Sequence, residues 1–281
     1  MISARKSLQV FRKEWDNCTS CGLGARRQSA NEKVIHGQGA QRRMMVVLEA
    51  PTWAEEKNKD VLCSDGGTFL SAVLKQLGLL EHVYVTYSVL CRSCRPDIDP
   101  GTGLPRTRRG TNGLQVPAYR DIPPTNDQLH ACKKRLHEEI YLVDPAVILA
   151  CGATAASAVL GKLTTLASIR GEPMHIAVEG AGRVASVTEK RRSWARTVRG
   201  ETTWPTLPSS VRYLMVPTYD PLFVYRQYSD QRANSPGSQF TRDITVAAEI
   251  MTKYQELTAG TLVEAAVEPD DEVDEEDTYD E

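Results

Sequence analysis

The cysteines of this chain have the spacing of metal ligands. Cys18 and Cys21 form a CxxC pair in NCTSCGL, and Cys91 and Cys94 form a second pair after an apolar run. Cys132 follows on a segment with helical periodicity. Thiolates in such pairs bind a zinc ion or an iron-sulfur cluster. Spacing alone leaves three interpretations open, namely zinc, an iron-sulfur cluster, and unrelated buried thiols.

The cysteine count argues against a disulfide framework. Seven cysteines are an odd number, and the N-terminal stretch lacks the apolar segment of a secretory signal. No apolar run approaches the roughly 18 residues that a membrane helix needs. We therefore expect a cytoplasmic protein with reduced thiols and no membrane association. Cys63 and Cys151 are expected to be small buried residues.

Two carboxylates follow apolar runs, at the place where an α/β protein builds its active site. Glu49 follows MMVVL, and Asp220 stands in PTYDP after RYLMV. A proline comes directly after Asp220, which is the pattern of a helix N-cap with proline at the first helical position. On local sequence the capping interpretation is favoured for Asp220. Glu49 has the corresponding alternative of a carboxylate that caps its own loop.

The elements that would position these groups alternate along the chain. Four near-continuous apolar runs predict strands covered on both faces. These runs lie at 44–48, 82–90, 146–150 and 212–216. Helical periodicity is present at 68–80, 126–143, 153–163 and 238–257. The order predicts an α/β fold, a three-layer αβα sandwich around a central four-stranded, mainly parallel sheet.

The composition predicts one domain and a tail. Residues 1–258 are expected to form the domain, with long loops at 95–124 and 180–210. The segment 259–281 is expected to be a disordered acidic tail, because its last twelve residues, DDEVDEEDTYDE, hold nine acidic residues and no basic one. The tail is a candidate binding site for a protein partner, and the protein is expected to be a monomer.

The loop 180–210 interleaves basic residues with two tryptophans. Such a composition suits phosphate contacts and base stacking, and the alternative is a solvated charged loop. We expect Arg191, Arg192 and Arg196, together with Arg226, to contact nucleic acid.

Six segments in order resemble the family 4, or iron-sulfur, uracil-DNA glycosylases. They are CTSCGLGARRQSANEKVIHGQG, LEAP, VYVTYSVLCR, PPTNDQLHAC, CGATAASAVLG with IRG, and PTYDPLFVYR. The resemblance implies the fold of that family, DNA as the partner, and a 4Fe-4S cluster. The matching cluster ligands are Cys18, Cys21, Cys91 and Cys132, with Cys94 as an alternative to Cys91.

The base pocket departs from the family motifs. Glu49, Ala50 and Pro51 of the first motif remain. An aromatic that holds the base, an asparagine that reads it and a histidine that stabilises its departing anion are replaced. The matching residues here are Leu62, Tyr87 and Asp220. Tyrosine loses the paired donor and acceptor of asparagine, and only a protonated Asp220 would donate a hydrogen bond as histidine does.

Three functions follow from these residues. The first is a DNA glycosylase of altered activity that hydrolyses the N-glycosidic bond of uracil or another modified pyrimidine, with Glu49 and Asp220 as base and acid. The second is a catalytically inactive module that binds nucleic acid. The third is a partner-binding protein whose acidic tail competes with nucleic acid for the basic loops.

Overall fold

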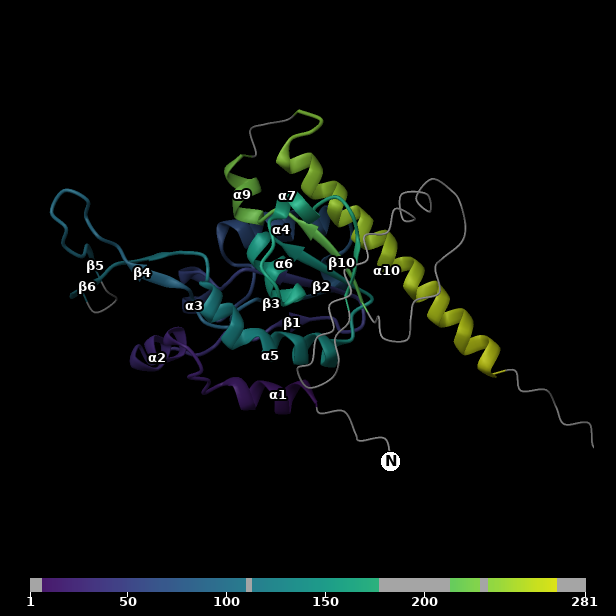
Figure 1. Cartoon of the computed structure of the whole chain (residues 1–281), viewed down its shortest axis with the longest axis horizontal. Coiled ribbons are helices and arrows are strands. Elements are labelled where there is room, and N and C mark those ends of the chain that lie inside the picture. Colours follow the sequence, from purple (N-terminus) through teal and green to yellow (C-terminus); the bar gives the residue numbers. More distant parts are fainter. Residues whose placement is uncertain (1–6, 110–112, 177–212, 228–231, 267–281) are drawn as a thin grey trace, which may run out of the picture.

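The computed structural model describes residues 7–109, 113–176, 213–227 and 232–266 (Figure 1). Its centre is a six-stranded sheet in the order β1-β3-β2-β8-β10-β9. The strands are β1 Gln38–Gly39, β2 Met44–Leu48, β3 Val83–Tyr87, β8 Val147–Cys151, β9 Met174–Ile176 and β10 Tyr213–Thr218. The pairs β2–β3, β2–β8 and β8–β10 are parallel, whereas β1 and β9 are antiparallel edge strands. The four predicted strands thus form the parallel centre, and the two edge strands were not predicted.

Helices cover both faces of the sheet. They are α1 Leu8–Trp15, α2 Gly22–Ser29, α3 Trp53–Asn58, α4 Asp65–Gln76, α5 Asn126–Val143, α6 Ala153–Leu160, α7 Leu166–Ile169, α9 Pro221–Arg226 and α10 Pro236–Ala266, with a short 3-10 helix η1 Leu80–His82. One buried cluster joins α5 and α6 to the sheet, and a second joins α4, α9 and α10 to it. This arrangement confirms the predicted three-layer α/β architecture. No helix of the described residues is long and apolar enough to cross a membrane.

The strands are apolar throughout because each face of the sheet meets helices. Neighbouring residues of a strand point to opposite faces. In β2, Val46 belongs to the cluster with α4 and α10, while Val47 belongs to the cluster with α5 and α6. Both valines are fully buried. A continuous apolar run is therefore what this sheet requires.

Two segments that the sequence predicts to be irregular contain regular secondary structure. Helix α10 continues to Ala266, so the first part of the predicted tail, 259–266, is helical. The predicted loop 95–124 contains four short strands, β4 Cys94–Pro96, β5 Thr107–Arg109, β6 Gln115–Pro117 and β7 Tyr119–Asp121. Strand β4 pairs with β7 and β5 with β6, both antiparallel. We call residues 94–109 and 113–121 the β-arm, which extends away from the sheet in Figure 1. The acidic residues 270–281 and the loop 180–210 lie outside the described residues.

Candidate active site

A cavity of about 490 Å³ lies at the carboxyl ends of β2, β3 and β10. Its walls come from the loop after β2, the start of α4, the end of the β-arm and the start of α9. The lining residues are Leu48, Glu49, Ala50, Pro51, Thr52, Glu55, Ser64, Gly66, Gly67, Tyr87, Ser93, Arg120, Asp121, Ile122, Pro123, Pro124, Asp220, Pro221, Leu222 and Arg226. The sheet topology thus brings together residues from segments far apart in the sequence, as expected of the carboxyl edge of an α/β sheet.

Glu49 and Asp220 approach each other across Gly152. A Cβ atom placed on Gly152 would lie 3.1 Å from Glu49 Oε1 and 3.4 Å from Asp220 Cβ. Gly152 has a φ of +93°, a backbone conformation that L-residues rarely adopt. Its backbone N–H donates to the carbonyl of Thr218 at 2.8 Å. The missing side chain at Gly152 therefore leaves space for the two carboxyl groups.

The environment raises the pKa of both carboxyl groups above their ordinary values. Burial raises the pKa of Glu49, the Asp220 carboxylate raises it further, and hydrogen bonds from Thr154 oppose both effects. Burial also raises the pKa of Asp220, against the backbone N–H groups of Phe223 and Leu222 and the nearby Arg226 cation. Raised carboxyl pKa values widen the pH range in which such a group can donate a proton.

Asp220 also caps a helix. Its Oδ1 accepts a hydrogen bond from the backbone N–H of Phe223 at 3.0 Å, and Pro221 stands at the first position of α9. The capping interpretation of the sequence is therefore confirmed, and the same residue lines the cavity.

Glu55 is a buried residue of the cavity that the sequence analysis did not single out. It is 2% exposed. Its Oε2 accepts from the backbone N–H of Thr52 at 2.7 Å, and its Oε1 accepts from the hydroxyl of Ser64 at 2.9 Å. Burial raises the pKa of Tyr87, and the Glu55 carboxylate raises it further. Glu55 therefore joins the loop after β2 to the start of α4, and its charge acts on Tyr87 at the end of β3.

The structure places the remaining predicted residues in three ways. Ala50, Pro51, Tyr87 and Arg226 line the cavity. Leu62 does not line it and instead packs against the core cluster on the side of α4 and α10, with its backbone against Gly67. The loop residues Arg191, Arg192 and Arg196 lie outside the described residues.

The four predicted cluster ligands line one small second pocket. Cys18 and Cys21 precede α2, Cys91 follows β3, and Cys132 lies on α5. Within the described residues, no group of three or more His, Cys, Asp or Glu side chains is arranged to hold a metal ion. The donor set of the pocket is nevertheless entirely thiol, which is the donor chemistry of an iron-sulfur cluster or a tetrahedral zinc.

Electrostatics separate Cys94 from these four cysteines. Burial raises the pKa of Cys91 to about 11, and charges on Cys132 and Cys21 contribute, while Arg27 lowers it. The groups that act on Cys94 after burial are Arg26, Arg92, Glu56 and Asp121, none of them a cysteine. Cys91, rather than Cys94, therefore shares an environment with the other three thiols.

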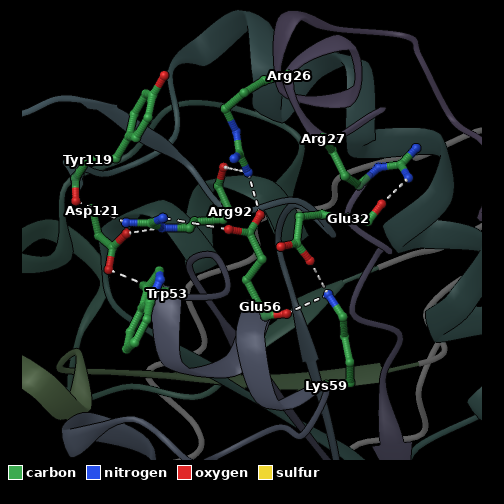
Figure 2. A network of polar contacts seen from close by, with 9 residues as sticks. All are labelled: Arg26, Arg27, Glu32, Trp53, Glu56, Lys59, Arg92, Tyr119 and Asp121. Atoms are coloured by element: carbon green, nitrogen blue, oxygen red, sulfur yellow. Dashed lines mark hydrogen bonds and ion pairs between the residues drawn. The ribbon is translucent and has the colours of Figure 1, made fainter. Parts of the chain in front are cut away.

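A polar network connects α2, which follows Cys21, to α3 and the β-arm (Figure 2). Arg26 on α2 pairs with Glu56 on α3. Arg92 lies between Glu56, at 3.6 Å, and Asp121 of the β-arm. The backbone N–H of Trp53 donates to Asp121 Oδ2 at 3.3 Å. Helix α3 begins just after the loop of Glu49. These contacts thus hold it against α2 on one side and against the β-arm on the other.

A second ion pair lies beside this network. Lys59, at the end of α3, contacts Glu32 Oε2 at 2.6 Å, and Arg27 donates to the carbonyl of Glu32 at 3.0 Å. Arg27 also donates to the carbonyl of Cys18 at 3.1 Å. The segment 18–32 therefore contacts α3 through two ion pairs, Arg26 with Glu56 and Glu32 with Lys59.

Comparison with known proteins gives the same assignment as the motifs. The model of the Uracil DNA glycosylase superfamily matches residues 36–242. One similar protein is the Type-4 uracil-DNA glycosylase of Thermotoga maritima, which is 27% identical over 177 residues. The matched region is 62% of this chain and 77% of that protein.

Proposed function

Because this chain belongs to the Uracil DNA glycosylase superfamily, we propose that it binds DNA and hydrolyses the N-glycosidic bond of a modified pyrimidine. The observation that carries this proposal is the meeting of Glu49 and Asp220 in one cavity at the carboxyl edge of the sheet. A flipped nucleotide reaches such a cavity when its base leaves the stack.

The two carboxyl groups have complementary roles in this reaction. Water attacks the sugar carbon as the bond to the base breaks, and the base leaves with the bonding electrons. Glu49 in its ionised form accepts the proton of the water. Asp220 in its protonated form donates a hydrogen bond and then a proton to the departing base. The products are an abasic site and the free base.

Tyr87 favours a base other than unmodified uracil. Its side chain is 1% exposed and lines the cavity at the end of β3. At this position the family motif carries an asparagine that pairs with the edge of the base. A tyrosine ring has a single polar atom there, so the hydrogen-bond pattern that selects uracil is lost.

A 4Fe-4S cluster on Cys18, Cys21, Cys91 and Cys132 forms part of the proposal. The shared pocket of these four thiols supports it, as does the Type-4 assignment of the similar protein. These four thiolates would hold the cluster, and they come from the segment before α2, from the segment after β3 and from α5. Iron and sulfide analysis of protein purified without oxygen tests this assignment, and stoichiometric zinc without iron would contradict it.

The decisive experiment is single-turnover base release from oligonucleotides that carry uracil, hypoxanthine or 5-hydroxymethyluracil. Glu49→Gln should slow release by about 100-fold or more, the usual contribution of a general base. Glu81→Gln is the matched control, because Glu81 is an exposed residue of η1 that does not line the cavity. Equal release by wild type and Glu49→Gln would refute the role of Glu49.

The second candidate function is a module that binds DNA without cleaving it. The observation in its favour is that Asp220 already accepts the capping hydrogen bond of Phe223 and that no histidine occupies its place. This candidate predicts tight, salt-dependent DNA binding with no base release from any of the three substrates. Base release that depends on Glu49 would exclude it.

A further inference from the structure

The root of the β-arm places two arginines directly opposite each other. Arg95 on β4 and Arg120 on β7 are partners in the antiparallel register. Directly opposite residues of an antiparallel pair project from the same face and lie close together, and like charges there destabilise the pair. Both side chains are exposed. No ion pair joins either guanidinium to a carboxylate of the described residues.

Two other arginines of the β-arm, Arg106 and Arg108, have partners. Arg106 lies 3.2 Å from Asp99 and 3.9 Å from Asp97. Arg108 stacks over the ring of Trp53, at 4.8 Å from the ring centroid. On the second strand pair, Arg108 faces Val116 and Arg109 faces Gln115. In the described register only Arg95 and Arg120 therefore face each other as like charges. Their repulsion is a local feature that an anion would relieve.

One arginine of the pair lies at the cavity. Arg120 lines the cavity together with the two residues that follow it, Asp121 and Ile122. The root is held in place, because Asp121 accepts from Arg92 and from the backbone N–H of Trp53 (Figure 2). The backbone N–H of Ile122 also donates to the carbonyl of Ser93 at 3.0 Å. These contacts fix the direction of the β-arm relative to the carboxylates of the cavity.

We propose that Arg95 and Arg120 form a phosphodiester-binding site, which holds the DNA strand beside the nucleotide whose base enters the cavity. This inference rests on the proposed function as a DNA glycosylase. A guanidinium group binds phosphate oxygens in a bidentate manner. Two such groups on one face neutralise two phosphates, and the bound strand removes the repulsion that the free protein carries.

Fluorescence anisotropy with labelled single-stranded and duplex oligonucleotides tests the site over a range of salt concentrations. Loss of two phosphate contacts should lower the slope of log affinity against log salt by about 1.4 for single strands. If the two proteins bind alike in 1 M salt, this difference in slope makes Arg95→Gln/Arg120→Gln about 25-fold weaker than the wild type in 0.1 M salt. Arg106→Gln removes a charge that already has partners, and it should change the affinity far less.

Thermal melting distinguishes this role from a structural one. The double glutamine variant should melt at the same temperature as wild type or higher, because it removes a like-charge pair. The double lysine variant, Arg95→Lys/Arg120→Lys, keeps the charge and should recover most of the salt slope.

The outcomes separate the two proposals. Wild-type binding with an unchanged slope in the double glutamine variant overturns the phosphodiester site and leaves the proposed function standing. DNA binding that depends on the arginine pair, without base release from any substrate, supports the site and contradicts the glycosylase. A wild-type protein that binds no DNA overturns both.

Discussion

The charge on Asp220 should control the rate at which the cavity releases a base. As the N-glycosidic bond breaks, negative charge develops on the base. An ionised Asp220 about 4 Å from this charge would repel it by about 4 kcal/mol at an effective dielectric constant near 20. By transition-state theory, this repulsion corresponds to about a thousandfold in rate. Since burial raises the pKa of Asp220, base release should decline as the pH rises through that pKa and the carboxyl group ionises. Release should also decline at low pH, where Glu49 becomes protonated and no longer accepts a proton.

Two substitutions separate this charge from the helix cap. Asp220→Asn removes the charge but keeps a side-chain oxygen that accepts from the backbone N–H of Phe223. Asp220→Ala removes both. Loss of the cap costs about 1 kcal/mol, which lowers the melting temperature of a domain of this size by about 3 °C. The asparagine variant should melt as the wild type does, and only the alanine variant should melt lower.

Single-turnover base release between pH 5 and pH 9, from whichever substrate the wild type releases, gives the catalytic comparison. The wild type should lose activity above the pKa of Asp220, whereas Asp220→Asn should lose this alkaline decline and exceed the wild type at the alkaline end, by up to about a thousandfold. Both proteins should lose activity at the acid end, where Glu49 becomes protonated. If the two proteins have the same pH profile, the carboxyl group of Asp220 does not titrate in the reaction and its role as acid is wrong. Equal melting temperatures of the asparagine and alanine variants would instead show that the capping hydrogen bond to Phe223 does not stabilise the protein by the expected amount.

Two further substitutions test the geometry of the site and the cysteine pocket. Gly152→Ala places a methyl group 3.1 Å from Glu49 Oε1 and should slow base release, whereas Gly171→Ala, with a similar φ of +92° and open space around it, should leave catalysis unchanged. Both substitutions should cost about 1–2 kcal/mol of stability, measured by thermal melting, because both force an L-residue into a left-handed backbone. Cys91→Ser should abolish iron incorporation while Cys94→Ser retains it, since Cys91 and not Cys94 lines the pocket of the other thiols. Iron retained in Cys91→Ser would show that the ligand set is different.

The parallel centre of the fold was predictable because its signal is strong and local. Each of β2, β3, β8 and β10 is a run of apolar residues long enough to be recognised without its neighbours. The edge strand β1 has two residues, Gln38 and Gly39, and neither is buried. Such a strand exists through hydrogen bonds to Val83–Tyr87, and no hydrophobic period marks it in the sequence.

The β-arm was missed for a related reason. Residues 107–109 and 119–121 are exposed on both faces, so their sequence shows neither alternation nor an apolar run. Proline, glycine and arginine dominate the segment and are typical of a loop. Cross-strand backbone pairing determines these strands, and that pairing depends on residues up to 27 positions apart, as between Cys94 and Asp121.

The candidate site was only partly visible in the sequence. Glu49 and Asp220 follow strands, so the topology rule found them, whereas Tyr87 is the last residue of β3 and was identified only through the family motif. Glu55 was missed, although Thr52 and Glu55 have the spacing of a capping box, which the structure contains. The family motif places Leu62 in the pocket, whereas its half-buried side chain packs against the core cluster instead.

The cap and the active site are one position because of how the chain turns. Strand β10 ends at Thr218 and helix α9 begins at Pro221, so the residue that caps α9 must stand at the carboxyl edge of the sheet. A helix N-cap favours aspartate, asparagine, serine or threonine, whereas the family motif at this position carries a histidine. Aspartate therefore gains a hydrogen bond to the helix and loses a hydrogen-bond donor to the base unless it is protonated. Stability of α9 and catalysis at high pH are opposed at this residue, and the asparagine variant should satisfy both.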